Sequence, residues 1–314
     1  MAVRRKKNPK RSRRGRIGLR IFAGIVLALM LCVGGAMLNA DVVRVRRAEL
    51  ELRDLPPAFD GRTILFASDI DLCGLNTAEK SGKLFEQLQS LRPDILLLGG
   101  DYNSASWLEL LNRGEARQHS AAQGLRQRAD FFHYISDFDA PLGKFAIAAP
   151  EDADPEALAS QMIEAGVRPL FNDWAAVTLG GDTLWIIGVS AESANLNAAG
   201  NAFSGDDCVI VAAYSPTVLP VLVTSEARDG GRWADLVLTG HTHGGQAQLF
   251  GRTALQLNRQ EQHYFSGWTM ENMLPILTTT GVGCEGVNLR VGTAPEVWLI
   301  TLRSVESGVW SEEF

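Results

Sequence analysis

The chain has 314 residues, of which 46% are hydrophobic and 21% are charged, as expected for a globular protein with one large domain and an additional segment. Its charge is uneven, because the first twenty residues contain ten Lys and Arg and no Asp or Glu, while the remainder carries a formal charge of −16. This distribution argues against nucleic-acid binding by the acidic part, since recognition of a phosphate backbone needs clustered cations.

Residues 1–20 predict a basic arm in the cytoplasm, and residues 21–40 predict a transmembrane anchor. The anchor segment has no charged residue, and as a helix it spans about 30 Å, which matches the hydrocarbon core of a bilayer. The positive charges before it favour a cytoplasmic N-terminus. The sequence therefore predicts a single-pass protein of the cell membrane, with its main domain outside the cytoplasm and the membrane as its partner.

A cleaved signal peptide is the alternative, with Leu38, Asn39 and Ala40 forming the cleavage site. Leu38 is a poor residue at the −3 position of such a site, and the apolar run is longer than the usual core of a signal peptide. We therefore favour an uncleaved anchor. Nucleic-acid binding by the basic arm is a third interpretation, and the apolar segment beside the arm argues against it.

The rest of the chain predicts a stalk or connecting strand at residues 41–57, one domain at residues 58–303 and a tail at residues 304–314. Apolar runs between turn signals predict strands at residues 63–67, 94–98, 144–148, 177–179, 183–189, 208–213, 236–238, 274–280 and 296–303. Helical periodicity predicts helices at residues 78–91 and 155–165, and a mostly helical region at residues 107–138.

Polar side chains follow several of these strands where each strand ends. Asp69 and Asp71 follow the first strand on one side of an extended segment, Asp101 follows the second strand, and His241 and His243 lie in a Gly-rich loop after the strand at 236–238. Open α/β sheets place ligands at the carboxyl ends of their strands, and carboxylates and imidazoles bind divalent metals. The pattern predicts a metal site. Turn-capping aspartates are the alternative, but they explain one such residue more easily than three together with His243.

The order of these segments resembles that of the calcineurin-like metallophosphoesterases. The strands are followed in family order by DID (69–71), GGDYN (99–103), APED (149–152), YSP (214–216) and GHTHGGQ (240–246), of which the last is the most specific. Together with the closing stretch at residues 278–302, the loop GHTHGGQ is similar to the membrane-anchored bacterial branch. The resemblance covers residues 59–302 and implies an α/β fold, a two-sheet sandwich flanked by helices, here preceded by one N-terminal transmembrane helix.

The resemblance also implies which residues bind metal. The first ion would be held by Asp69, Asp101, His243 and Asp71, which stands where the family has His, and such a set suits Mn²⁺, Fe²⁺ or Zn²⁺. For the second ion Asp101 and His241 remain.

Other second-ion positions have been substituted. Pro150 replaces the family's Asn and Tyr214 replaces its His, so we do not expect a tightly bound second ion. Glu151 stands at the position of the family's catalytic His and is the candidate proton donor to the leaving group.

Two functional hypotheses follow. In the first, the loss of the second ion leaves a metallophosphoesterase-like protein with weak or absent hydrolysis, which serves as a binding or regulatory module at the membrane. In the second, the domain is an active phosphoesterase that uses one ion, or a rearranged pair with Glu151 as a ligand, and acts on an envelope or lipid phosphoester. The sequence identifies neither the substrate nor a protein partner.

Overall fold

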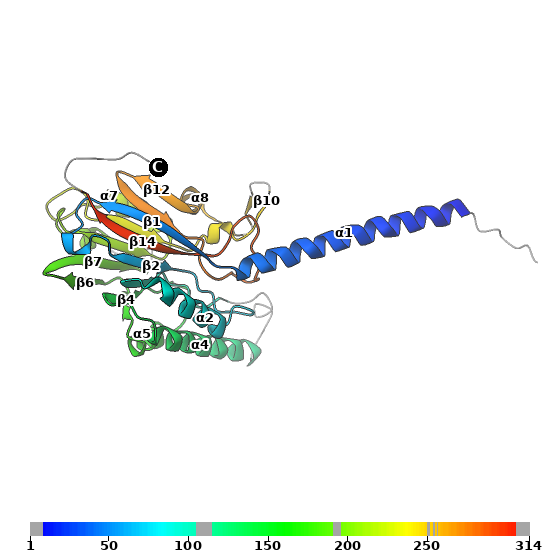
Figure 1. Ribbon diagram of the computed structural model, residues 1–314, viewed down its shortest axis with the longest axis horizontal. Coiled ribbons are helices and arrows are strands. Elements are labelled where there is room, and N and C mark those ends of the chain that lie inside the picture. The colour runs from blue at the N-terminus through cyan, green and yellow to red at the C-terminus, as the bar shows by residue number, and fades with distance from the viewer. Residues whose placement is uncertain are drawn as a thin grey trace, which may run out of the picture.

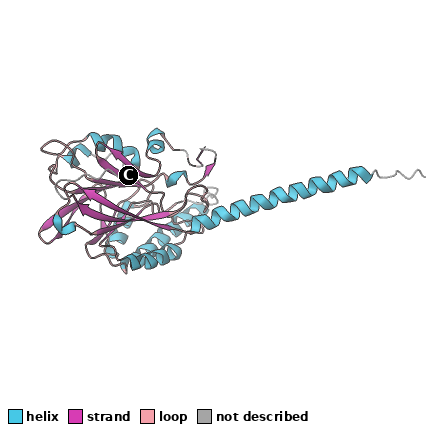
Figure 2. Cartoon of the chain, turned by 45° about the horizontal axis from the view of Figure 1, so that its top comes forward, coloured by secondary structure: helices cyan, strands magenta, loops and turns pink. Residues whose placement is uncertain are grey.

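The computed structural model describes residues 9–104, 115–190, 196–249, 252, 253, 255 and 257–305. Two six-stranded sheets pack against each other, helices lie on their outer faces, and one long helix projects from the domain (Figure 1). Figure 2 shows the same separation between the compact domain and the projecting helix. Residues 1–8 of the predicted arm, 107–114 of the predicted helical region and 306–314 of the predicted tail lie outside the described residues.

The first sheet has the strand order β1-β14-β2-β3-β4-β5. Its strands are β1 (Arg44–Leu52), β14 (Glu296–Ser304), β2 (Thr63–Ala67), β3 (Ile95–Leu98), β4 (Gly143–Ala146) and β5 (Arg168–Pro169). Strands β2 to β5 are parallel, β14 is antiparallel to β2, and β1 is parallel to β14. The carboxyl ends of β2, β3 and β4 therefore lie together, beside the beginning of β1.

The second sheet has the order β12-β13-β9-β8-β7-β6. Its strands are β12 (Gly267–Glu271), β13 (Leu274–Thr278), β9 (Leu236–Thr239), β8 (Val209–Ala213), β7 (Asp182–Val189) and β6 (Trp174–Leu179). The four central strands are parallel, and an antiparallel hairpin partner closes each edge. A small ribbon of β10 (Gln248–Leu249) and β11 (Arg252–Thr253) follows β9.

Alternation along the strands explains why the sheets form a sandwich. On β2, Ile64 and Phe66 face the second sheet, whereas Leu65 and Ala67 face the helices, and all four are fully buried. The outer face of the first sheet is covered by α2 (Ala78–Leu88), α4 (Glu115–Ser136) and α5 (Pro155–Glu164), and that of the second by the short helices α6 (Leu196–Gly200) and α7 (Leu219–Thr224). Each fully buried aliphatic side chain stabilises this arrangement by about 1.5–3 kcal/mol. The predicted two-sheet sandwich flanked by helices is confirmed.

The segment at residues 41–57, expected to be a connecting strand or stalk, contributes an integral strand. Every residue of β1 pairs with β14, from Arg44 opposite Glu296 to Leu52 opposite Ser304. The ordered fold thus begins at Arg44, inside the predicted stalk. Within β1 only Leu50 and Leu52 are buried, so the strand lacks the long apolar alternation by which strands are found in a sequence.

The helix α1 (Pro9–Asp41) precedes the domain and extends away from it (Figure 1). Within it, the stretch Arg16–Asp41 is long and apolar enough to cross a membrane, and most of its side chains are exposed. The one N-terminal apolar helix expected from the sequence is therefore present.

Candidate metal centre

The carboxyl ends of three strands bring the five predicted metal ligands to one edge of the sandwich. Asp69 and Asp71 follow β2, Asp101 follows β3, and His241 and His243 follow β9. Main-chain hydrogen bonds extend the pairing of β2 and β3 into their loops, from Asp69 N to Gly100 O at 3.0 Å and from Asp71 N to Asp101 O at 3.0 Å. The first three carboxylates are thus held by the backbone of two adjacent strands.

Four of these side chains converge on one point. Ligand atoms of Asp69, Asp101 and His243 lie within 4.8 Å of one another. The His243 Nε2 atom is 3.8 Å from Asp69 Oδ1 and 3.6 Å from Asp71 Oδ2. These separations are too long for hydrogen bonds, but two ligands that each lie about 2.0–2.2 Å from a shared cation are separated by about this much.

A polar atom at this point is buried without a partner. Asp69, Asp71 and His243 are all at most 2% exposed. Among the described residues, Asp71 Oδ2, which faces His243 Nε2, makes no hydrogen bond. An unsatisfied buried polar atom is costly, and an ion is one of the usual reasons for its presence. The donor set fits a divalent cation held by Asp69, Asp71, Asp101 and His243.

Burial and mutual repulsion shift the titration of the four side chains in the metal-free protein. Burial raises the pKa of Asp69 to about 6, against the attraction of His241 and Arg290. Burial, followed by repulsion from neighbouring carboxylates, raises the pKa of Asp71 and of Asp101 well above the ordinary value. Burial, followed by the Arg290 charge, lowers the pKa of His243. A neutral imidazole is a metal ligand, whereas the crowded carboxylates need a positive charge to remain ionised together.

All five residues predicted as ligands have left-handed backbone conformations. Their φ angles are 53° for Asp69, 50° for Asp71, 59° for Asp101, 71° for His241 and 51° for His243. Such conformations cost about 1–3 kcal/mol each at residues other than Gly, and they cluster at functional sites. Asp and His tolerate this region better than most residues. The backbone conformation therefore favours the same residue types that can bind a metal ion.

Glycines from two other loops allow the carboxylate loop to be packed closely. A side chain at Gly283 would collide with the Asp71 Cβ atom and the Ile70 carbonyl, and one at Gly281 would lie 2.7 Å from the Asp69 Cβ atom. A side chain at Gly240 would collide with the Asp69 carboxylate. The glycines of GHTHGGQ and of the loop after β13 therefore set the position of the metal ligands, because only Gly permits this approach.

Two charged residues that the sequence did not single out hold the loops in place. The Asp152 carboxylate accepts the main-chain N–H groups of Asp101 at 3.1 Å, Tyr102 at 2.8 Å and Ala149 at 2.8 Å, and so joins the loops after β3 and β4. The fully buried Arg290 donates from Nη1 to the His243 carbonyl at 2.8 Å and from Nη2 to the Gly283 carbonyl at 2.6 Å. No local sequence signal identifies these roles, since they depend on the tertiary contact.

Of the four positions at which the chain departs from its resemblance, Asp71 is among the buried carboxylates, and the other three lie at the mouth of the site. Pro150 and Glu151 are exposed after β4. Tyr214 is 5% exposed after β8. Burial, with the charges of Asp101 and Glu151 beside it, raises the pKa of the Tyr214 phenol, which also hydrogen bonds with Glu151. The phenol is therefore a hydrogen-bond donor at neutral pH and a poor metal ligand.

The His241 side chain lies apart from the four convergent donors. Its Nε2 atom is 3.4 Å from Glu261 Oε1, and its ring centroid is 4.8 Å from that of Tyr214. Its main-chain N–H donates to Asp69 Oδ1 at 2.9 Å. The residue thus orients Asp69 through the backbone, and its predicted role as a ligand of a second ion stays a prediction.

Glu261 belongs to the short helix α8 (Arg259–His263), which the sequence reading did not include. Asn258 caps this helix, and the Glu261 carboxylate accepts the Asn258 N–H at 2.7 Å in a capping box. The spacing Asn-x-x-Glu is a helix-start signal that could have identified α8. It could not have shown that the second carboxylate oxygen of Glu261 faces His241.

The chain resembles known proteins in sequence over most of its length. It is 23% identical over 296 residues to a transmembrane protein with metallophosphoesterase domain of Danio rerio, covering 89% of this chain and 62% of that protein. It is 24% identical over 296 residues to the uncharacterized metallophosphoesterase YkuE of Bacillus subtilis (strain 168), covering 90% of this chain and 94% of that protein. It is 22% identical over 275 residues to an uncharacterized metallophosphoesterase of Aquifex aeolicus (strain VF5), covering 85% of this chain and 94% of that protein. These relatives support a place in the metallophosphoesterase family.

Other comparisons are weaker. No protein-family model matches the chain. A crystal structure of a dimetal phosphatase from Danio rerio has a TM-score of 0.41 and 10% identity, covering 71% of this chain and 88% of that chain. That value is too low to carry an argument. The chain spans about three fifths of the length of the transmembrane relatives. Its match covers 62% of the protein from Danio rerio and 64% of the protein from Bos taurus.

Proposed function

We propose that the protein is a membrane-anchored phosphoester hydrolase of the metallophosphoesterase type, which uses one divalent cation and turns over slowly. The observation that carries this proposal is the convergence of Asp69, Asp101 and His243, beside an unpartnered buried oxygen of Asp71 that faces His243. The anchor is α1, with its basic end in the cytoplasm and the domain outside it. The curated relatives with metallophosphoesterase names support the reaction class.

The cation would be Mn²⁺, Fe²⁺ or Zn²⁺. When bound, it supplies Lewis acidity toward a phosphoryl oxygen and toward water. Asp69, Asp71, Asp101 and His243 would hold it, Arg290 holds the His243 loop, and the Asp152 carboxylate holds the Asp101 loop. The protein thus orients its metal ligands by buried charge-assisted hydrogen bonds, which act without reorganisation during the reaction.

The mouth residues would act on the substrate. The protonated Tyr214 phenol can donate a hydrogen bond to a phosphoryl oxygen. Glu151 beside it stays the candidate proton donor by its position in the family resemblance, although it is exposed and lacks the burial that favours a protonated carboxyl group. No second ion clamps attacking and leaving oxygens together, because Pro150 has no side-chain donor and Tyr214 remains neutral. We expect slow hydrolysis for this reason.

The test is hydrolysis of methyl p-nitrophenyl phosphate by the full-length protein in detergent, with Mn²⁺ and with a chelator. Activity is expected with Mn²⁺ only, and Asp101→Asn should reduce it by at least about 100-fold. The matched control is Asp139→Asn, a carboxylate in the turn before β4. Equal activity of wild type and Asp101→Asn would overturn the proposed hydrolysis at this site.

A binding or regulatory module without hydrolysis is the second candidate. The loss of two donors, at Pro150 and Tyr214, and the engagement of His241 by Glu261 favour it. It predicts that the wild-type protein binds the ion yet hydrolyses no phosphoester above the rate of Asp101→Asn. The same assay, run together with metal analysis, therefore separates the two candidates.

A further inference from the structure

The last two turns of α1 are packed into the domain. Ala36 is 8% exposed and Ala40 is 3% exposed, in contrast to the preceding part of the helix. Asn39 donates from Nδ2 to the carbonyl oxygens of Arg290 at 3.1 Å and Thr293 at 2.7 Å, and the Arg290 N–H donates to the Ala36 carbonyl at 3.1 Å. The helix therefore ends as a docked element and not as a free tether.

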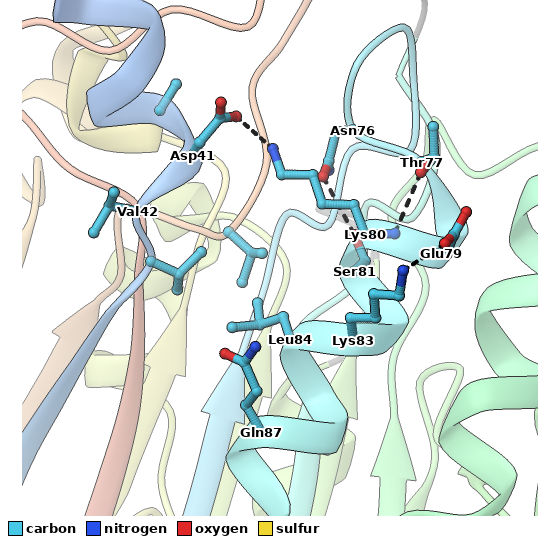
Figure 3. A pocket seen from close by; sticks show the side chains of 13 residues that line it. Asp41, Val42, Asn76, Thr77, Glu79, Lys80, Ser81, Lys83, Leu84 and Gln87 are labelled. Carbon is cyan, nitrogen blue, oxygen red and sulfur yellow. Dashed lines mark hydrogen bonds and ion pairs between the residues drawn. The ribbon is translucent and has the colours of Figure 1, made fainter.

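Asp41 fixes the end of the helix from two further directions. Its carboxylate accepts hydrogen bonds from Asn288 Nδ2 at 2.9 Å and from Lys80 Nζ at 2.5 Å. Figure 3 shows Lys80 of α2 reaching toward Asp41. Cleavage after Ala40 would remove Asn39 and its two hydrogen bonds, whereas Asp41 would remain, and the loss of the Asn39 contacts argues for an uncleaved anchor.

The docked end of α1 lies at the same end of the sandwich as the metal site. Arg44 at the start of β1 pairs with Glu296 at the start of β14, and β2 runs in the opposite direction, with Phe66 opposite Trp298. The carboxyl end of β2, which leads to Asp69, is thus beside the exit of α1. Figure 1 shows α1 leaving the domain on the side where β10, which follows the His243 loop, also lies.

The docking contacts also set the depth of the domain. The uncharged segment at residues 21–40 is just long enough to span about 30 Å of hydrocarbon. Ala36 lies inside that segment, about 6 Å along the helix axis from Ala40. The loop that contacts Ala36, with Arg290 and Asn288, is therefore level with the last turn of the apolar segment, at the boundary between the hydrocarbon and the lipid headgroups.

Apolar side chains project from this end of the domain. Leu75 is 61% exposed and Val287 is 44% exposed. Leu75 lies in the loop between Asp71 and α2, and Val287 is next to Asn288, which bonds to the end of α1. Both residues belong to loops that carry or support the metal ligands, because Gly283 of the second loop packs against Asp71.

A polar groove lies beside the helix exit. It has a volume of about 590 Å³ and is bounded by Asp41 at the end of α1, by Val43 after it, and by the first turns of α2 (Figure 3). Lys80 and Lys83 line it with side-chain exposures of 37% and 61%, and they form ion pairs with Asp41 and Glu79, respectively. The groove therefore offers polar groups of both signs and no net charge beside the helix exit.

We propose that this end of the domain, formed by residues 73–80 and 285–293 around the exit of α1, rests on the bilayer, so that the metal site acts on phosphoesters carried by membrane lipids. The proposal rests on the proposed function for its hydrolytic step and on the docked helix for its geometry. Water attacks phosphorus of the lipid phosphoester, the bond to the leaving oxygen breaks, and that oxygen takes a proton.

The orientation of the domain on the bilayer can be tested without an assay of hydrolysis. The full-length protein, with Cys32→Ser and Cys73→Ser, receives one cysteine at Leu75, at Val287 or at the control position Ile163, and is labelled with an environment-sensitive fluorophore in phosphatidylcholine vesicles. Ile163 is 64% exposed near the end of α5, which leads back to the opposite end of the sheet. Spin-labelled lipid should quench the labels at positions 75 and 287 several-fold more than the label at 163. Equal quenching at all three would overturn the orientation.

The substrate class is tested with two phosphodiesters that share a leaving group. One is phosphatidyl-p-nitrophenol in phosphatidylcholine vesicles, and the other is soluble methyl p-nitrophenyl phosphate. The double substitution Leu75→Asp with Val287→Asp should lower hydrolysis of the lipid about tenfold and change that of the soluble ester less than twofold, while Ile163→Asp changes neither. An equal loss on both substrates, or a wild-type preference for the soluble ester, would overturn the proposal. If neither ester is hydrolysed, the proposed function fails, and the quenching result still decides the orientation.

Discussion

The two halves of the site differ in burial and in the state of their donors. The inner half, with Asp69, Asp71 and His243, is at most 2% exposed, and its ligand atoms face one another without hydrogen bonds between them. In the outer half, Glu151 is exposed, Tyr214 is a neutral phenol hydrogen bonded to Glu151, and His241 faces Glu261.

The two halves are also held in different ways. The inner residues are fixed by left-handed backbone, close glycine contacts and the Arg290 guanidinium, and their one departure from the family resemblance, Asp71, is again a residue with a metal-binding side chain. The outer residues come from the separate loops after β4 and β8, which tolerate replacement because loops at a surface carry fewer packing constraints. Asp101 belongs to both halves, since burial and then repulsion from carboxylates of both halves raise its pKa.

The largest expected effect comes from giving the outer half the donors that the family resemblance implies. The triple substitution Pro150→Asn, Glu151→His and Tyr214→His should add a second ion per chain and raise hydrolysis of methyl p-nitrophenyl phosphate by about 100-fold, since a general acid and a second Lewis acid are gained together. Metal analysis and initial rates of the full-length protein measure both.

The matched control for this gain changes the same positions without adding ligands, as Pro150→Ala, Glu151→Ala and Tyr214→Phe. It should bind no additional ion. A triple variant that still binds a single ion would show that the outer half is limited by its backbone geometry and not by its side chains.

The next largest effect comes from disturbing the inner half without removing a ligand. Gly283→Ala places a methyl group against the Asp71 Cβ atom and should weaken Mn²⁺ binding by about 10–100-fold, the usual cost of misplacing a metal ligand. Titration of the metal-free protein with Mn²⁺ measures the affinity. Gly286→Ala is the control, because it has a positive φ of 69° in the same loop but no atom near its added methyl group. Equal affinities of the two variants would contradict the role given to Gly283.

The crowded carboxylates should also make the metal-free protein less stable as pH rises. Asp69 has a pKa of about 6 in the folded protein and near 3.8 when unfolded, so between these values the folded state binds more protons and stability falls with increasing pH. The raised pKa values of Asp71 and Asp101 act in the same direction. Asp69 alone should lower the free energy of unfolding by up to about 3 kcal/mol between pH 4 and pH 7.

Thermal unfolding at pH 5, 6 and 7, with a chelator and with Mn²⁺, measures this effect. The cation should remove most of the decrease, because it binds the ionised carboxylates. In the metal-free protein, Asp69→Asn should show a smaller decrease than wild type. A metal-free protein whose stability rises from pH 5 to pH 7 would contradict the assigned repulsion.

The smallest effect is expected at the contact between the outer half and α8. Glu261→Gln removes the carboxylate beside His241 and should change the hydrolysis rate less than about fivefold, with no change in the number of ions bound, because His241 is not among the convergent donors. Glu271→Gln is the matched control, since Glu271 is 3.1 Å from the exposed His263. Loss of the ion in Glu261→Gln would mean that His241 is a ligand positioned by Glu261.

The sequence predicted the inner half better than the outer half for a physical reason. Asp69, Asp101 and His243 follow buried strands, and parallel strands bring their carboxyl ends to one edge whatever the details of packing. The direction of the His241 ring depends on α8, and the contact of Arg290 with His243 spans 47 residues of chain. Such contacts are set by tertiary packing and leave no local pattern.

The same reason explains why the place of β1 in the first sheet and the existence of β12 were not predicted. Strand β1 pairs with β14 through its backbone while most of its side chains remain exposed, so its residues lack an apolar alternation. Strand β12 is at the edge of the second sheet and is only half-buried. Central strands such as β2 are buried on both faces and were identified from their apolar runs with the bounds Thr63–Ala67.

The central claim is that the inner half of the site binds an ion and the outer half does not. The number of ions bound by the full-length wild-type protein tests it most directly. Elemental analysis after Mn²⁺ loading should give about one ion per chain, and His243→Ala should give none, while His263→Ala, at an exposed imidazole, keeps it. Two ions in the wild type would contradict the loss of the outer half, and no ion above the level of His243→Ala would contradict the inner site itself.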